Sequence, residues 1–258
     1  MKRTLSFILL AACSLLPMGA QAPMDGGVWN DNTGKHINAH GGSIFNYKGT
    51  YYWYGESRSA DGKPYSSLGV SCFTSKNLKD WTNHGLVLPV SSEPGCDIEG
   101  GCIIERPKVL YNARARKFVM WFHLEMKGKG YAAARSGVAV SDPPFGPFRF
   151  VRSGRVNAGR YPIGFALADT TDLRQKLTEP EYKGWWTPQW YTQIERGMFF
   201  MRDFQGGQMA RDMTVFVDDD GKAYHIFSSE DNLTLNIAQL TDCLLYTSPS
   251  PRDYAASR

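Results

Sequence analysis

The fold is decided by one stretch, His40 to Glu56, which reads HGGSIFNYKGTYYWYGE. A polar head leads an apolar run, Lys48-Gly49 supplies a turn, and an aromatic run ends at a carboxylate. Aromatic and β-branched residues suit a pleated, half-buried surface, and a glycine between two such runs is typical of a hairpin. The stretch therefore predicts a strand, a tight turn and a second strand.

The same plan returns twice farther along the chain. Glu105 leads a second predicted strand pair that closes at Glu125, and Asp212 leads a third that closes at Glu230. From each polar head to its closing glutamate the spacings are 16, 20 and 18 residues. Three matches of this kind indicate an architecture of structural repeats.

The first two repeats each continue with two more predicted strands. Residues 69–75 and 85–88 follow the first pair, residues 137–141 and 154–156 follow the second, and the third repeat adds residues 233–240. Small four-stranded antiparallel units in a row are typical of β-propeller blades. A β-sandwich is the alternative, but it does not account for polar heads at matching positions. We therefore expect an all-β fold of about three blades.

Composition limits the classes of function. The 258 residues are 13% aromatic and 21% charged, which suits a chain with a sizeable core and argues against disorder. The formal net charge is +4, and without Lys2 and Arg3 there remain 27 basic and 25 acidic residues. This balance predicts no nucleic-acid partner and no anionic membrane partner.

The N-terminus has the pattern of an export signal, which we assign to residues 1–22. Lys2-Arg3 form a charged start, residues 5–16 form an apolar segment too short to span a bilayer, and residues 20–22 read Ala-Gln-Ala, a cleavage pattern. A bacterial lipobox ending at Cys13 is the alternative. Either way we expect a secreted or periplasmic protein with no transmembrane span.

The C-terminal residues 243–258 show no strand periodicity and have no counterpart elsewhere in the chain. Residues 244–253 resemble translated sequencing-adaptor DNA, and a natural disordered tail of low complexity is the alternative. We therefore expect the propeller segment to be residues 23–242, the N-terminal part of a longer domain, with a non-native or disordered tail after it.

Two further features leave alternatives open. Cys96 and Cys102 flank a short loop just before Glu105, where they form either a small disulfide loop or two free thiols. Four aromatic residues cluster in the segment 157–208, which interrupts the repeat. They form either a wall for a sugar's apolar face or anchors for a long loop: Trp185, Trp186, Trp190 and Tyr191.

The polar heads suggest a shared site. In a propeller the innermost strands start near the central axis, so their first residues converge: His40, Glu105-Arg106 and Arg211-Asp212. Carboxylates in a partly desolvated funnel are suited to glycosidic bond cleavage, which needs a protonated acid, a base and neighbours that set their pKa values. The alternative is that each arginine–carboxylate pair is a salt-bridged strand end. The matching positions in the repeat favour the functional interpretation.

Five motifs along residues 29–242 resemble glycoside hydrolase family 43, in the branch of the exo-β-1,3-galactanases and β-galactosidase-like members. They are His40-Gly41-Gly42, Tyr51 to Glu56, Glu105 to Val109, Ala210 to Met213, and Ser228 to Asn232. The resemblance implies a five-bladed β-propeller in the full enzyme and an inverting mechanism.

The resemblance also implies site residues. Asp212 matches the carboxylate that tunes the catalytic acid and orients the substrate. The glutamates at the sugar site are Glu105 and Glu230, which we group with Asp212 as catalytic. The residues that the resemblance or the repeat places in substrate binding are His40, Glu56, Tyr131 and Arg211.

The chain departs from the common family pattern at two points. His40-Gly41-Gly42 stands where many members have an aspartate base, and the galactanase-like branch shares this difference. The Glu-Ala-Pro motif that carries the family's catalytic acid does not occur in the sequence. We therefore expect the acid and the base to lie beyond Asp242 and this fragment by itself to be inactive.

The predicted function is an exo-glycosidase that releases galactose from β-galactan or arabinogalactan of plant type. An α-L-arabinofuranosidase or β-xylosidase on the same scaffold is one alternative, and a non-catalytic carbohydrate-binding propeller is another. No cofactor is required for this hydrolysis. A structural calcium ion on the propeller axis is compatible with the resemblance, but no ligand set in the sequence indicates one, and the spacings of a zinc site are absent.

Overall fold

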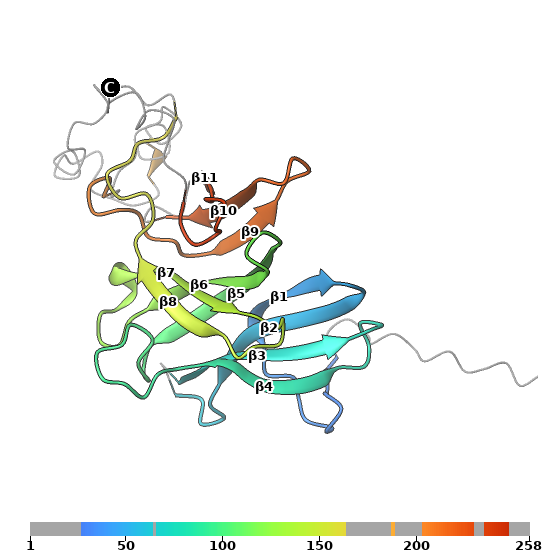
Figure 1. Ribbon diagram of the computed structural model, residues 1–258. Helices are drawn as coiled ribbons and strands as arrows, with labels where there is room; N and C mark the ends of the chain where they lie inside the picture. The colour runs from blue at the N-terminus through green and yellow to red at the C-terminus, as the bar shows by residue number, and fades with distance from the viewer. Residues whose placement is uncertain (1–26, 64–65, 164–186, 189–202, 230–234, 248–258) are drawn as a thin grey trace, which may run out of the picture.

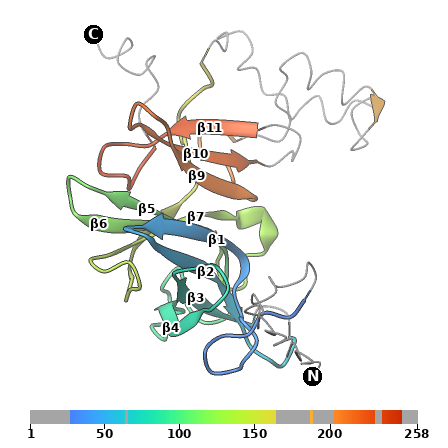
Figure 2. The same cartoon turned by 90° about the vertical axis from the view of Figure 1, so that its right-hand side faces the viewer.

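The structure, a computed structural model, describes residues 27–63, 66–163, 187–188, 203–229 and 235–247. In these residues three antiparallel sheets follow one another along the chain (Figures 1 and 2). Helix content is slight in the described ranges, where the 3-10 turn η1 (Tyr131–Ala133) is the helical element with assigned bounds. The predicted all-β fold is confirmed.

The first sheet has four strands in chain order, β1 (His40–Tyr47), β2 (Thr50–Arg58), β3 (Ser67–Ser75) and β4 (Thr82–Pro89). Lys48 and Gly49 join β1 to β2, with φ angles of 50° and 73°. Two left-handed residues form the tight turn whose twist matches that of the flanking strands. The hairpin predicted from Lys48-Gly49 is confirmed.

The second sheet repeats this order with β5 (Ile103–Asn112), β6 (Lys117–Glu125), β7 (Arg135–Ser141) and β8 (Arg149–Gly154). Its last strand was predicted at residues 154–156, and that placement is wrong. Phe148 is buried and its N–H donates to the Val87 carbonyl of the first sheet at 2.6 Å, so the strand begins directly after it. Val156 forms an isolated bridge with Gln208 instead.

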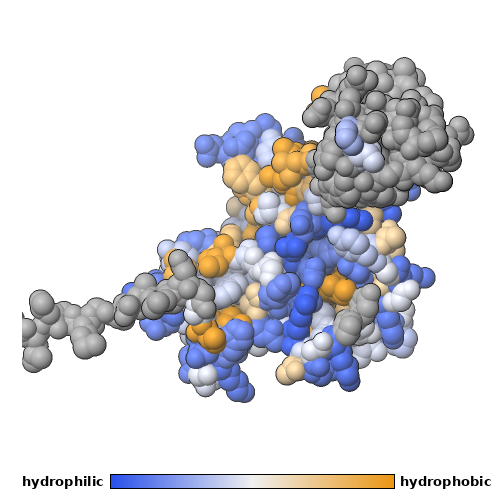
Figure 3. Space-filling view, turned by 180° about the vertical axis from the view of Figure 1, so that it is seen from behind, coloured by the Kyte–Doolittle hydropathy of each residue, from blue (hydrophilic) through white to orange (hydrophobic). Residues whose placement is uncertain are grey.

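The third sheet contains β9 (Met213–Val217), β10 (Ala223–Ser228) and β11 (Leu235–Gln239) in the order β11-β10-β9. Two four-stranded sheets and one of three strands are what about three propeller blades require. Large apolar side chains are exposed on the third sheet, and Figure 3 shows hydrophobic surface gathered there, at the top of the view. They are Phe216, Val217, Leu235 and Ile237.

Two apolar cores lie between the sheets. The first joins sheets one and two around Tyr54, Ile104 and Phe122, and the second joins sheets two and three around Trp121 and Phe227. The strand β5 contacts β1, β2 and β3, while β9 contacts β5 and β6. The sheets therefore pack face to face with their first strands adjacent, which brings the three polar heads toward one region (Figure 2).

The sequence left two alternatives for Cys96 and Cys102, a disulfide or two free thiols. The thiols of Cys96 and Cys102 are both free, so the structure has the free-thiol alternative. Burial raises the pKa of the Cys102 thiol to about 12.

The predicted signal, residues 1–22, lies outside the described residues. Of the predicted tail, residues 243–247 are described, and the Leu244 carbonyl accepts a hydrogen bond from Trp121 Nε1 at 2.8 Å. Among the described residues, no helix is long and apolar enough to cross a membrane.

A buried histidine in the second core makes stability depend on pH. His225 is fully buried against the rings of Trp121 and Phe227, with centroid distances of 4.9 and 4.7 Å. Neither ring nitrogen has a hydrogen-bond partner among the described residues. Burial lowers the pKa of His225 to about 3, because nothing there compensates the charged form. The unfolded chain therefore binds the proton more readily between about pH 6.5 and pH 3.

Stability is expected to fall as the pH drops through this window. Between pH 7 and pH 5 the protein loses about 2 kcal/mol of unfolding free energy through His225. His225→Phe removes that proton and keeps a ring in the core, so urea unfolding at the two pH values should show a smaller loss. The exposed His36→Phe serves as the control and keeps the wild-type pH dependence. An equal loss in wild type and His225→Phe would contradict this account.

Candidate functional site

The first polar head is turned by a β-bulge. In the β1–β2 ladder His40 lies opposite Glu56, and the next regular pair is Ser43 with Tyr54, so β1 has one extra residue. Gly41 has a φ of 55°, and a Cβ on Gly42 would lie 2.1 Å from the Tyr54 carbonyl oxygen. Only glycine fits at position 42, and glycine adopts the left-handed conformation at position 41 without strain, which explains why a Gly-Gly pair follows the head.

The second polar head is turned in the same way. Glu105 lies opposite His123, and the next regular pair is Lys108 with Trp121. Between them Arg106 has a φ of 53°, a left-handed conformation that is uncommon for a residue with a side chain. Such backbone strain is concentrated at functional sites. The matching bulges of the two blades aim His40 and Glu105 toward the same space.

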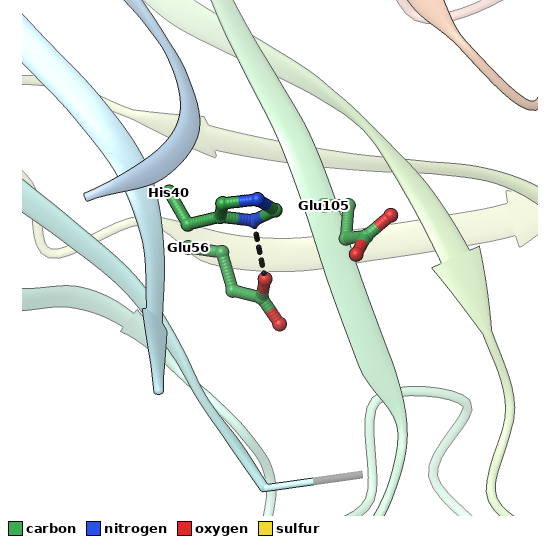
Figure 4. A group of neighbouring side chains, drawn as sticks. All are labelled: His40, Glu56 and Glu105. Atoms are coloured by element: carbon green, nitrogen blue, oxygen red, sulfur yellow. Dashed lines mark hydrogen bonds and ion pairs between the residues drawn. The ribbon is translucent and has the colours of Figure 1, made fainter. Parts of the chain in front are cut away.

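One arginine joins the carboxylates of the two blades. Arg58, at the end of β2, places Nε 2.7 Å from Glu56 Oε2 and Nη2 2.8 Å from Glu105 Oε1. His40 Nδ1 lies 3.2 Å from the same oxygen of Glu56. Figure 4 shows His40 and Glu56 joined across β1 and β2, with Glu105 beside them on β5. The cluster is therefore continuous from the first blade to the second.

Burial makes this guanidinium important. The Glu56 side chain is 2% exposed, whereas that of Arg58 is 47% exposed. A buried carboxylate is stable only when it is paired and hydrogen-bonded. Arg58 is itself held in place, because its backbone N–H donates to Asn38 Oδ1 and its carbonyl accepts from Asn38 Nδ2. The chain thus holds two carboxylates from neighbouring blades around one guanidinium.

Three of these side chains are also spaced closely enough to bind a metal ion. One atom from each of His40, Glu56 and Glu105 lies within 4.8 Å of the others, a spacing that could hold a cation. Arg58 already donates to both carboxylates and supplies the positive charge that a metal ion would bring. The donor set therefore fits an arginine-bridged carboxylate pair better than a metal centre.

The third polar head joins the cluster through a second arginine. Arg106 Nε lies 2.5 Å from Asp212 Oδ1, and the Asp212 side chain is 73% exposed. The Asp212 carbonyl accepts a hydrogen bond from the Ser228 N–H, which fixes the backbone at the start of the third blade. From the sequence alone, each arginine could have formed a salt bridge with the carboxylate next to it in the chain. The structure instead pairs Arg58 with Glu105 and Arg106 with Asp212, each between blades.

Tyr131 and Arg211 complete the described cluster. The Arg211 guanidinium lies 4.2 Å from the centroid of the Tyr131 ring, which is a cation–π contact. Burial raises the pKa of Tyr131, Arg211 opposes the rise, and the charges of Asp212, Glu125 and Glu105 add to it. Tyr131 therefore lies in the electric field of carboxylates from two blades. The structure brings the six predicted site residues that it describes into one region.

The closing glutamates are not equivalent, which corrects the repeat read from the sequence. The head Glu105 lies opposite His123, whereas Glu125 pairs with Ile103. In the second blade His123 therefore takes the place that Glu56 has in the first. His123 Nδ1 lies 2.8 Å from the Ala210 carbonyl oxygen, and Nε2 lies 3.3 Å from Glu125 Oε1. In the first two blades, the second strand thus ends in a polar pair two residues apart: Glu56 with Arg58, and His123 with Glu125.

Sequence reasoning missed Arg58 and His123 as parts of the cluster. Their spacing was the available signal. Arg58 lies two residues after Glu56, His123 lies two residues before Glu125, and residues two apart on a strand share a face. Of the predicted site residues, Glu230 lies outside the described residues, as does the aromatic cluster Trp185, Trp186, Trp190 and Tyr191.

Of three comparisons with known proteins, the comparison with solved structures found matches. No model of a protein family matches the chain, and no curated protein matches it. Among solved structures, a GH43 β-1,3-galactosidase with galactodeoxynojirimycin is 56% identical, with a TM-score of 0.78 over 86% of this chain and 64% of that one. An exo-β-1,3-galactanase from Clostridium thermocellum is 34% identical, with a TM-score of 0.63 over 86% of this chain and 39% of that one.

A more distant structure shows the same likeness. An exo-β-1,3-galactanase from Phanerochaete chrysosporium, solved with galactose, is 26% identical, with a TM-score of 0.60 over 86% of this chain and 40% of that one. The chain spans less than two thirds of the length of each of these structures. The blade order, the bulged heads and the 56% identity together lead to one conclusion: the chain belongs to glycoside hydrolase family 43.

Proposed function

We propose that the chain is the sugar-binding part of an inverting exo-glycosidase that releases terminal galactose from β-1,3-linked galactan or arabinogalactan. The observation that carries the proposal is the pair Glu56 and Glu105, held together by Arg58. Carboxylate oxygens accept hydrogen bonds from sugar hydroxyls and, being charged, bind them more strongly than neutral acceptors do. Similar solved structures with 34–56% identity are named β-1,3-galactosidases and an exo-β-1,3-galactanase, which supports galactose.

The described residues divide the work of substrate binding. Glu56 and Glu105 accept from hydroxyl groups of the terminal sugar. Tyr131, 47% exposed, offers an aromatic edge and face beside Arg211 for the sugar's apolar side. Asp212, held by Arg106, adjusts the proton affinity of the catalytic acid and orients the scissile bond.

The proton-transfer groups themselves are proposed to lie outside residues 23–242. An inverting glycosidase separates its acid and base by about 6.5–9.5 Å, since a water molecule attacks from the face opposite the leaving oxygen. The acid protonates that oxygen while the base takes a proton from the water. The sequence contains no Glu-Ala-Pro motif, so the proposal assigns sugar binding and acid tuning to this chain and no proton transfer.

We also propose that the protein is exported. The support is the sequence of residues 1–22, with its basic start, short apolar segment and Ala-Gln-Ala cleavage pattern. A polymeric galactan is too large to enter a cell, so an enzyme that shortens it has to meet it outside the cytoplasm. Mass spectrometry of the mature N-terminus distinguishes cleavage after Ala22 from lipidation at Cys13.

Calorimetric titration with monosaccharides tests the proposed function. Galactose is expected to bind, and Glu105→Gln is expected to weaken binding about tenfold because a charged acceptor is lost. Glu93→Gln, at an exposed loop position, is the matched control and leaves the affinity unchanged. Binding of arabinose or xylose in preference to galactose would show that the sugar is wrong. Binding of none of the three would contradict the proposal.

A further inference from the structure

The bulges of the first two blades are locked to each other. Ser43, on β1, donates from Oγ to the Pro107 carbonyl in the β5 bulge at 2.8 Å. In return Lys108, on β5, directs Nζ to the carbonyl oxygens of Gly42 and Gly41 in the β1 bulge, at 3.3 and 3.5 Å. Each blade thus supplies a side-chain donor to the irregular backbone of the other.

The need for such donors follows from the bulge itself. A bulge interrupts the ladder, so its carbonyls lose regular partners and must find others when water is excluded. Lys108 is half-buried between the sheets, and its single charge faces two carbonyl oxygens. An ammonium group suits two acceptors at different angles because its three protons rotate freely. The lysine is therefore well placed to fix the path of Gly41 and Gly42.

We propose that Lys108 is a positioning residue that holds the Gly41-Gly42 bulge, and through it the His40 side chain, against Glu56 at the sugar site. The proposal deepens the proposed function and rests on it, because it gives the lysine a role in galactose binding. Lys108 does not contact the carboxylates in the structure. It acts through the backbone that carries His40, which lies 3.2 Å from the Glu56 carboxylate.

The electrostatic setting makes this lock sensitive to pH. Burial and, as the smaller cause, the charge of Arg106 on the same strand together lower the pKa of Lys108 to about 8. The other charged or titratable groups at this junction are His40, one residue before the bulge, and Asp212, which is paired with Arg106. Below pH 8 the ammonium holds both carbonyls. As the pH rises through 8, the amine loses its charge and one donor, so the lock weakens.

Hydrogen exchange and sugar titration together test the proposal. Lys108→Met is expected to speed amide exchange in the β1 peptide and to weaken galactose binding about tenfold at pH 7. Wild-type affinity should fall between pH 7 and pH 9, whereas the weaker affinity of Lys108→Met should stay flat. Lys76→Met is the matched control. Lys76 Nζ also donates to a glycine carbonyl oxygen, that of Gly49, at 3.4 Å, but at the far end of the same hairpin.

The two readouts separate the possible failures. Faster exchange at His40–Tyr47 in Lys108→Met but not in Lys76→Met supports the lock whether or not galactose binds. Unchanged exchange overturns it. Exchange that rises while galactose affinity stays at the wild-type value shows that the lock is structural and overturns the positioning role. A wild-type protein that binds no galactose contradicts the proposed function, and with it the role of Lys108 at a sugar site.

Discussion

Under the proposed function, replacing Asp212 by asparagine is expected to lower turnover of the full-length enzyme by about a thousandfold while the protein stays folded. The neutral amide keeps the shape of the side chain and can still accept a hydrogen bond from Arg106, but the ion pair with the guanidinium 2.5 Å away is lost. Under the proposed function, the side chain then no longer sets the proton affinity of the acid. The Asp212 side chain is 73% exposed, so its replacement costs little stability. Hydrolysis of β-1,3-galactobiose by the purified enzyme measures the effect.

The control for this variant is another exposed aspartate in an ion pair. Asp142 contacts Lys117 at the outer turn of the second sheet, away from the polar heads. Asp142→Asn is expected to keep full turnover and the same melting temperature. If Asp212→Asn retained turnover within a few-fold of wild type, Asp212 would have no part in the site. If it unfolded, the role would have to be read from Asp212→Glu, which keeps the charge and moves it by one methylene.

Replacing Arg58 by methionine is expected to damage both stability and sugar binding. The buried Glu56 carboxylate would keep only His40 as a partner, and Glu105 would lose its contact with the first blade. Removing one partner of a buried ion pair leaves an uncompensated charge, which we expect to cost about 2 kcal/mol here since Arg58 is half exposed. Galactose affinity should fall about thirtyfold as the carboxylates change position.

Two further variants make the Arg58 prediction specific. Arg58→Lys keeps the charge but lacks the planar fork, so it should recover part of the stability and little of the affinity. Arg114→Met removes an arginine whose side chain is 85% exposed and should change neither quantity. Urea unfolding and calorimetric titration measure the two effects separately. Wild-type affinity in Arg58→Met would show that the carboxylate pair does not form the sugar site.

The strands could be predicted from the sequence because local pattern decides them. The Lys48-Gly49 turn and the alternating aromatic run place β1 and β2 correctly, and the repeat of that plan gives the remaining sheets. The strand β8 was misplaced because Phe148, after a turn rich in proline and glycine, is itself buried and hydrogen-bonded to Val87, so the strand begins directly after it. The residue at which such a strand begins depends on packing against the neighbouring sheet, and the sequence pattern does not contain that information.

The site could be predicted only in part, for a related reason. Periodicity located the heads His40, Glu105 and Asp212, but it did not reveal the bulges that turn the first two of them. It also treated Glu56 and Glu125 as equivalent, although the ladder places His123 opposite Glu105. The pairs that join the blades, such as Arg58 with Glu105, connect residues distant in the chain. Their choice of partner follows from the tertiary structure and not from spacing.

A crystal structure of the protein soaked with galactose tests the central claim most directly. The account predicts one galactose at the blade openings, with its hydroxyl groups hydrogen-bonded to the carboxylates of Glu56 or Glu105 and its apolar face near Tyr131. Galactose bound elsewhere at saturating concentration, with neither carboxylate in contact with the sugar, would contradict it.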